Sequence, residues 1–244
     1  MRAWRDWRPP VDFPAFDKNK LAAAGTRLGE SLQVNEYDAC RVFAALGVPQ
    51  APSEIITTPE QPVSVGFPAV AKVLSPDIAH KTDAGGVVLH IPNAAALQLA
   101  VREIFARVRA KHANARIDGV LVQRMANGLA EVIVGYKRDP QVGPIVVLGI
   151  GGVLAEIYRD IALRLAPVTV EDARQMIEEV KGLAIIRGYR SMPRGDLAAL
   201  AETVSAFSQL AAMAQVQEAE INPLIVKPEG EGVVAVDGLI VCRI

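Results

Sequence analysis

Four stretches of the chain repeat their apolar residues at helical spacing, and each follows a residue that can cap a helix. Asn35 precedes residues 36–46, which end at Gly47. An asparagine before such a stretch and a glycine after it are the usual signals of a helix start and a helix end. Three further candidate caps precede the same pattern: Asn93, Thr169 (with Asp172 as its capping-box partner) and Asp196. We therefore predict at least four amphipathic helices.

Short runs of β-branched and aliphatic residues, bounded by glycine and proline, lie between these helices and predict strands. In chain order they are PAVAKVL, GGVVLHI, GVLVQRM, EVIVGYK, PIVVLGI, EINPLIV and GVVAVDGLIV. The strands come in groups and do not alternate one by one with helices. Because grouped strands favour antiparallel pairing, we expect an α+β (α/β) protein with two lobes and mixed, largely antiparallel sheets.

The pattern also divides the chain. Residues 1–30 contain three prolines and both tryptophans, Trp4 and Trp7, and have no clear apolar periodicity. We predict an N-terminal arm or linker there, a first lobe over residues 31–125 and a second lobe over residues 126–244.

Composition excludes several classes of protein. The chain has 244 residues, of which 51% are hydrophobic and 22% charged, so it can bury a large core and is not a disordered chain. Its formal net charge is -1 and its pI is near 6.3. This balance lacks the basic surface that a nucleic-acid-binding protein needs, and we expect no nucleic-acid partner.

Cysteine usage and hydropathy indicate the compartment. Cys40 and Cys242 lie far apart and form no metal-ligand or disulfide pattern, which favours a reducing environment. The most apolar run begins at Pro144 and has roughly half the length that a membrane-spanning helix needs. We expect a cytoplasmic protein with no membrane partner.

The densest group of reactive side chains lies in and around the segment SPDIAHKTDAGG, residues 75–86. Lys72 interrupts the apolar strand before it, and such a lysine either extends its ammonium group to solvent at a sheet edge or binds an anion such as phosphate. Gly85 and Gly86 fit either a phosphate-binding loop or a plain hairpin turn. His80 can act as a nucleophile, a base or a phosphate carrier, although a loop histidine is more often a solvated surface group.

A second group of polar side chains lies near the C-terminus. Glu220 and Asn222 share one face of a predicted strand, and Asp237 ends the next strand of the hairpin. Carboxylate and amide oxygens on adjacent strands suit Mg²⁺, while the alternative is a set of exposed acidic residues on a hairpin. Pro223 removes a backbone donor in mid-strand and marks an edge or a bulge.

Several segments, in their order along the chain, resemble a known family. They are FPAVAKVLSPDIAHKTDAGGV, EVIVGYKRDPQVGPIVVLGIGG, LRLAPVT, IIRGYR, EINPLIV and VAVDG. Together they are similar to the ATP-grasp domain of ADP-forming (NDP-forming) acyl-CoA synthetases, which is related to the succinyl-CoA synthetase β-subunit. The resemblance covers residues 33–241 and implies the ATP-grasp fold, in which two α+β lobes clamp a nucleotide between their sheets.

The resemblance also implies residue roles. His80 corresponds to the catalytic histidine that takes phosphate from a phosphohistidine on a CoA-binding partner and passes it to ADP. The implied nucleotide-binding residues are Lys72, Gly85, Gly86, Val122, Gln123 and Glu131, with the strand around Val122 and Gln123 meeting adenine. The implied Mg²⁺ ligands are Asn222 and Asp237, with Glu220 as a supporting acid.

The implied activity is that of an acetate/acyl-CoA ligase (ADP-forming), which interconverts acyl-CoA, phosphate and ADP with acid, CoA and ATP. The resemblance implies ATP or ADP and Mg²⁺ as cofactors. It also implies a hetero-oligomer with a CoA-binding α-type subunit or domain that carries the first phosphohistidine. Two alternatives remain open: an ATP-grasp domain of an acetyltransferase-type or regulatory CoA-binding protein that senses nucleotide, and a non-catalytic interaction module.

Overall fold

A computed structural model gives the fold of the chain. The structure describes residues 15–26, 28, 33–78, 81–152, 160–188, 190 and 192–243. His80 and residues 1–14 lie outside the described residues, as does the segment 153–159.

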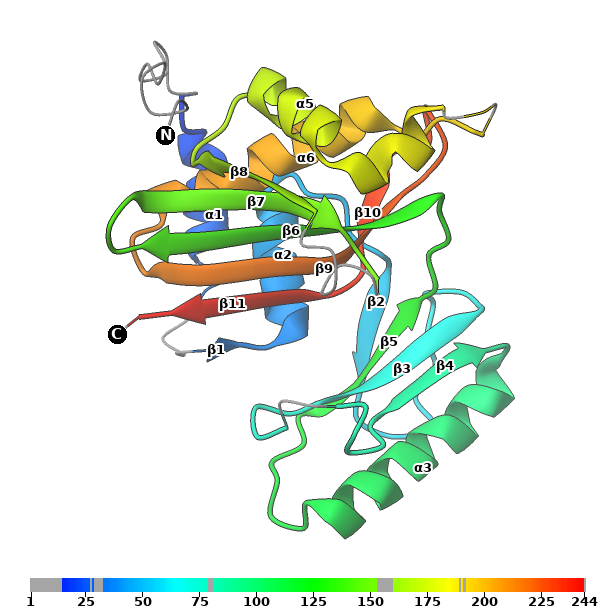
Figure 1. Cartoon of the computed structure of the whole chain (residues 1–244). Helices are drawn as coiled ribbons and strands as arrows, with labels where there is room; N and C mark the ends of the chain where they lie inside the picture. Colours follow the sequence, from blue (N-terminus) through cyan, green and yellow to red (C-terminus); the bar gives the residue numbers. More distant parts are fainter. Residues whose placement is uncertain are drawn as a thin grey trace.

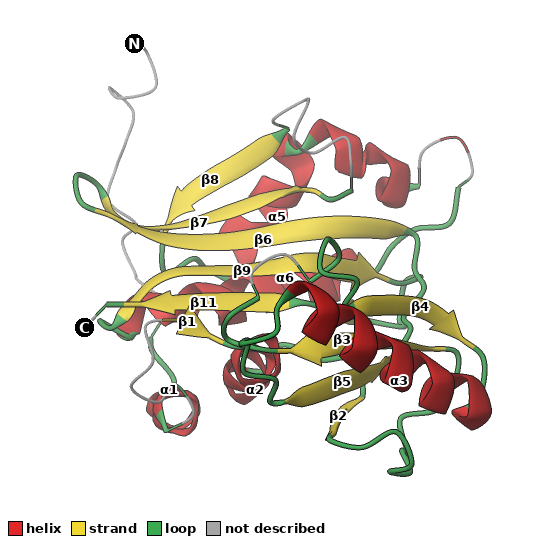
Figure 2. Cartoon of the chain, turned by 90° about the horizontal axis from the view of Figure 1, so that it is seen from below, coloured by secondary structure: helices red, strands yellow, loops and turns green. Residues whose placement is uncertain are grey.

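The smaller of the two sheets has four strands, in the order β2-β5-β3-β4. Every strand pair in it is antiparallel. The strands are β2 (Ser53–Ile56), β3 (Ala69–Leu74), β4 (Val87–Ile91) and β5 (Gly119–Arg124). Helix α3 (Ala94–Lys111) covers one face, and Figures 1 and 2 show it on the outer side of this sheet, away from the larger lobe.

The larger sheet has the order β1-β11-β9-β6-β7-β8, and β10 also pairs with β9. All of these pairings are antiparallel, as the grouped strands predicted. The strands are β1 (Gln33–Val34), β6 (Ala130–Asp139), β7 (Gly143–Ile150), β8 (Ile161–Leu165), β9 (Val216–Val226), β10 (Val233–Ala235) and β11 (Gly238–Cys242).

Helices cover one face of the larger sheet (Figure 1). The α-helices are α1 (Lys18–Gly25), α2 (Glu36–Leu46), α5 (Val170–Glu179) and α6 (Leu197–Ser208), and the 3₁₀ helices are η1 (Lys181–Arg187) and η3 (Gln209–Ala212). Phe43 of α2 and Phe207 of α6 meet edge to face, with ring centroids 5.2 Å apart, inside the core of this lobe. None of the described helices is long and apolar enough to cross a membrane.

Local signals explain where the helices begin and end. The Asn35 side chain accepts a hydrogen bond from the amide of Asp38, and Gly47 ends α2 in the left-handed conformation with φ of 104°. Thr169 and Asp172 form the predicted capping box at the start of α5. The helices predicted after Asn93 and Asp196 are also confirmed, since each cap side chain accepts an amide hydrogen bond.

The structure also contains elements that the apolar pattern did not indicate. Helix α1 lies within the predicted arm and buries Ala24 completely, while β2 and β8 are short strands without a clear signal. Residues 33–46, which the sequence grouped with the first lobe, form β1 and α2 and pack with the larger sheet, because the apolar side of α2 lies in that core. The limits 1–30, 31–125 and 126–244 stay predictions.

Candidate functional site

Lys72 lies on β3, one of the two inner strands of the small sheet, and faces the larger lobe. Its neighbours Ala71 and Val73 point into the core under α3, so the alternation of a strand directs Lys72 to the opposite face. The residue is only 8% exposed. Because β3 is paired on both sides, Lys72 does not extend to solvent at a sheet edge, and the alternative proposed from the sequence is excluded.

The ammonium group of Lys72 meets acidic groups from the larger lobe. Its Nζ lies 2.5 Å from Oε1 of Glu36 and 3.4 Å from Oδ2 of Asp237. It also lies 3.5 Å from the carbonyl oxygen of Val236. These contacts join strand β3 to the start of α2 and to the β10–β11 turn, across the boundary between the two lobes. We call this region the lobe junction.

Glu36 is the residue at this junction that sequence reasoning missed. It is the first residue of α2, is 4% exposed, and uses both carboxylate oxygens: Oε1 pairs with Lys72 and Oε2 pairs with Lys81. An acidic residue in the first helical turn is usual because it offsets the helix dipole. The sequence therefore held no signal that distinguished Glu36 from an ordinary exposed acid.

The charges at the junction shift each other's pKa values. Burial lowers the pKa of Lys72 most strongly, but the attraction of Glu36 and Asp237 outweighs it and leaves the Lys72 pKa raised. Partial burial raises the pKa of Asp237, with Lys72 opposing and Glu36 reinforcing the shift. Lys72 therefore remains cationic at neutral pH.

Cys40 lies one turn after Glu36 on α2 and is affected by the same charges. Burial, reinforced by the negative charges of Glu36 and Asp237, raises the pKa of its thiol to about 12. The thiol is protonated at neutral pH and is a packing group.

The three predicted metal-site residues lie together at one corner of the larger sheet. The backbone amide of Asn222 donates to the backbone carbonyl oxygen of Asp237 at 3.2 Å, so these two residues lie opposite each other in adjacent segments. The Nδ2 group of Asn222 also donates to Oε1 of Glu220 at 3.0 Å. Asp237 Oδ1 accepts from the amide of Gly238 at 2.8 Å, and Oδ2 faces Lys72.

This donor set fits Mg²⁺ in kind, since it offers two carboxylates and an amide oxygen, and the Asp237 side chain is 40% exposed. Among the described residues, no group of three or more histidine, cysteine or acidic side chains could hold a metal ion. A magnesium ion does not need such a group, because it completes its shell with water and substrate phosphate.

The predicted adenine-contacting residues lie on β5. Val122 points into the core of the small lobe, and its strand is paired with β2 on one side and β3 on the other. Gln123 pairs with Val70 of β3, is 2% exposed and shares the face of Lys72. Its Oε1 atom has no hydrogen-bond partner, which leaves a buried acceptor on the sheet face that carries Lys72. Glu131 is exposed at the start of β6.

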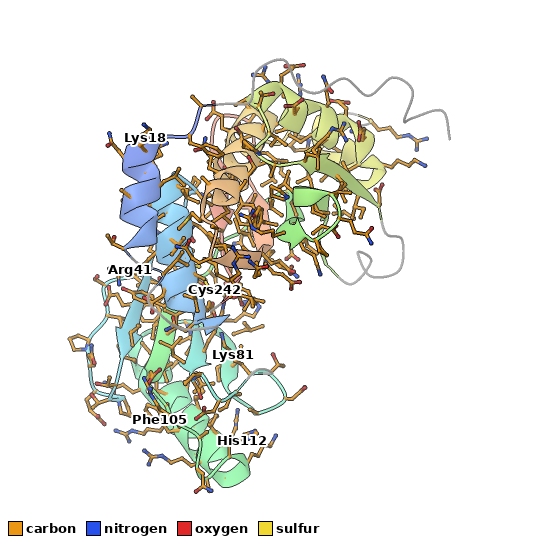
Figure 3. The ribbon with its side chains drawn as sticks, turned by 90° about the vertical axis from the view of Figure 1, so that its left-hand side faces the viewer. Lys18, Arg41, Lys81, Phe105, His112 and Cys242 are labelled. Atoms are coloured by element: carbon orange, nitrogen blue, oxygen red, sulfur yellow. The ribbon has the colours of Figure 1, made fainter. Side chains whose placement is uncertain are left out.

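The described part of the loop 75–86 is shaped by its glycines. The amide of Gly85 donates to the backbone carbonyl oxygen of Thr82 at 2.9 Å, and the amide of Gly86 donates to that of Lys81 at 2.8 Å. A Cβ at Gly86 would lie 2.4 Å from Cγ1 of Val73, so a side chain there would displace the loop. Both amides are used inside the turn. Figure 3 shows Lys81 and His112 in the small lobe, and the Nζ group of Lys111 in α3 donates to the carbonyl oxygen of Asp83 in this loop at 2.6 Å.

Comparison with known proteins gives the same fold. A family model described as an ATP-grasp domain matches residues 27–242. The chain is 40% identical over 198 residues to "Acetate--CoA ligase [ADP-forming] I" of Archaeoglobus fulgidus, covering 79% of this chain and 29% of that protein. It is 36% identical over 200 residues to "Acetate--CoA ligase [ADP-forming] I subunit beta" of Pyrococcus furiosus, covering 80% of this chain and 86% of that subunit.

A solved structure agrees closely. An acetyl-coenzyme A synthetase 1 of Ca. Korarchaeum cryptofilum, in complex with coenzyme A, Ca-AMPCP and HgCl+, superimposes with a TM-score of 0.82 at 33% identity. The match covers 90% of this chain and 97% of that one. Another structure of that protein holds coenzyme A and Mg-AMPPCP, with a phosphohistidine segment pointing towards the nucleotide binding site.

Proposed function

Because the chain belongs to the ATP-grasp family, together with the β subunits of ADP-forming acetate–CoA ligases, we propose that it is the nucleotide-binding part of an ADP-forming acyl-CoA ligase. In this role it transfers a phosphoryl group between a histidine and ADP or ATP. The chain spans 29% of its single-chain Archaeoglobus relative, so the complete ligase activity depends on parts outside this sequence.

The observation that carries this proposal is the position of Lys72. A buried lysine on the inner face of one lobe meets an acid-lined corner of the other lobe, 3.4 Å from Asp237. Such an ammonium group can neutralise charge that develops on a phosphoryl group during transfer. Lys72 and the unpaired Oε1 atom of Gln123 lie on the same face of the small sheet, which supports a phosphate site at Lys72 and a base site at Gln123.

In the proposed complex, Asn222 and Asp237 would hold Mg²⁺, with Glu220 orienting Asn222 through the hydrogen bond at 3.0 Å. Mg²⁺ bound there would supply positive charge to the phosphate oxygens. Lys72 binds the phosphates from the opposite lobe. Gly85 and Gly86 keep the described part of the loop 75–86 compact. Gln123 and Glu131 line the nucleotide with their side chains, whereas Val122, whose side chain points into the small-lobe core, contributes only its backbone.

His80 is the proposed phosphate carrier. In the direction of ATP synthesis, a terminal oxygen of ADP attacks the phosphorus of phospho-His80, the P–N bond breaks and a P–O bond forms, which leaves neutral imidazole. Phospho-His80 receives its phosphate from a phosphohistidine on a CoA-binding α-type subunit or domain. We propose a hetero-oligomer or a longer polypeptide, since both arrangements occur among the relatives.

Titration calorimetry with ADP and ATP, each with and without Mg²⁺, tests the nucleotide site on the full chain. We expect one site per chain, with tighter binding when Mg²⁺ is present. If neither nucleotide binds under either condition, the proposal is wrong and the chain is a non-catalytic module.

A further inference from the structure

Glu36 forms ion pairs with two lysines from different segments of the small lobe. Its Oε1 atom pairs with the ammonium group of Lys72 on strand β3, and its Oε2 atom pairs with that of Lys81 in the loop that follows the strand. Glu36 itself belongs to α2, whose apolar side is fixed in the core of the larger lobe. One carboxylate therefore joins the strand, the loop and the other lobe.

The two acids around Lys72 differ in their access to ligand. The Glu36 side chain is 2% exposed, whereas that of Asp237 is 40% exposed. A metal ion or a phosphate can reach Asp237, and a metal bound there would draw this carboxylate away from Lys72. Glu36 is enclosed and stays as the permanent counter-ion. It also lies in the first turn of α2, where the helix dipole stabilises its negative charge.

We propose that Glu36 is a positioning residue for phosphoryl transfer, which holds the Lys72 and Lys81 ammonium groups in place beside the nucleotide phosphates. This inference rests on the proposed function, because it assigns Glu36 a role in the same reaction. Glu36 acts through the lysines and does not contact the nucleotide.

The Glu36→Gln variant separates positioning from binding. Labelling of the full chain by γ-³²P-ATP and Mg²⁺ reports transfer, and calorimetry with ADP reports affinity. Misplaced lysines should slow labelling by about 10- to 100-fold. The Kd for ADP should stay the same or tighten by up to about threefold, because a competing negative charge is gone. A labelling rate equal to that of the wild type, or a parallel loss of rate and affinity, would overturn the proposal.

Asp38→Asn is the matched control. Asp38 lies in the same first turn of α2 and pairs with Arg41 at 3.6 Å, not with a junction lysine. The Asp38→Asn substitution removes the same negative charge from the same end of α2 but leaves Lys72 and Lys81 paired with Glu36. The labelling rate of this variant should therefore equal that of the wild type. If Asp38→Asn slows labelling as much as Glu36→Gln, the effect belongs to the helix terminus and the proposal is wrong.

Lys81→Met gives an independent test if Glu36→Gln fails to fold, because it leaves the Lys72–Glu36 pair intact. The proposal expects slower labelling at an unchanged ADP affinity, and an unchanged rate contradicts it. In the Glu36→Gln/Lys81→Met double variant, the combined loss of labelling rate should be smaller than the product of the two single losses.

If the wild type itself neither binds nucleotide nor becomes labelled, the proposed function is wrong. If the wild type binds nucleotide and becomes labelled, and Glu36→Gln and Lys81→Met are labelled at the same rate as the wild type, only the proposed role of Glu36 is wrong.

Discussion

At the residue scale, the position of Lys72 makes a direct prediction. Replacing it with methionine removes the one junction cation that lies on the inner face of β3 among the described residues, while keeping most of the apolar stem of the side chain. We expect Lys72→Met to weaken ATP binding by about 10-fold or more, since a charge-assisted contact to phosphate is lost. Calorimetry measures this change.

Lys18→Met is the control for that substitution, because Lys18 is exposed on α1 at the helical side of the larger lobe (Figure 3). It should bind ATP as the wild type does. Equal affinities for Lys72→Met and the wild type would place the phosphates elsewhere on the chain.

Asp237 gives a prediction about pH. Its pKa is raised in the folded chain, chiefly by partial burial, so the ionised carboxylate opposes folding at neutral pH. Asp237→Asn should therefore raise the Tm at pH 7 by about 1–2 °C, a small value because solvent screens a group of this exposure. Below about pH 3 the carboxyl is protonated in both the folded and unfolded states, and the difference should vanish.

The same variant should lose the Mg²⁺-dependent part of nucleotide binding, because a proposed metal ligand is removed. Thermal melts across the pH range, with calorimetry at pH 7, measure both effects. If Asp237→Asn has a lower Tm at pH 7 than the wild type, the ion pair between Asp237 and Lys72 stabilises the fold. That result would contradict the expectation drawn from the raised pKa of Asp237.

Residue identities were predictable where a short motif carried them, and were missed where only tertiary contact did. Lys72 and Asp237 stand out in the sequence because each interrupts an apolar run. Glu36 does not, because its role depends on Lys72, 36 positions away, and on Lys81, 45 positions away. The glycine pair was recognised, but the use of its amides inside the loop could not be deduced from residue type.

At the element scale, caps explain why the helices were predicted. The signals at Asn35, Asn93, Thr169 and Asp196 are local, so they do not depend on the rest of the fold. Strand β8 lacked such signals because its outward residues Ile161 and Leu163 are apolar although they are exposed, which removes the usual alternation.

The capping box of α5 gives a stability prediction that is separate from function. Thr169→Ala removes the acceptor for the Asp172 amide at 3.0 Å and should destabilise the fold by about 1 kcal/mol, which lowers the Tm by about 2–4 °C. Thr169→Ser keeps the hydroxyl and should melt close to the wild type. Because α5 lies in the helical layer of the larger lobe, we expect ADP affinity to be unchanged in both; a large loss of affinity in Thr169→Ala alone would contradict this separation.

At the scale of the whole molecule, the candidate site exists only because two lobes meet. Lys72 and Asp237 are 165 positions apart, and neither local propensity nor apolar periodicity can bring them together. The periodicity was sufficient for the α+β class and the antiparallel sheets. The ATP-grasp arrangement came from the resemblance of ordered motifs, because physical patterning alone does not specify how one sheet faces another.

The most direct test of the central claim is labelling of the full chain with γ-³²P-ATP and Mg²⁺, compared with the His80→Ala variant. The account predicts an acid-labile, base-stable phosphate on the wild type, discharged to ATP when excess ADP is added. It predicts no label on His80→Ala, with ADP binding retained. Label of equal amount on His80→Ala, or no label on a wild-type chain that binds ATP, would contradict the claim that this chain passes phosphate through His80.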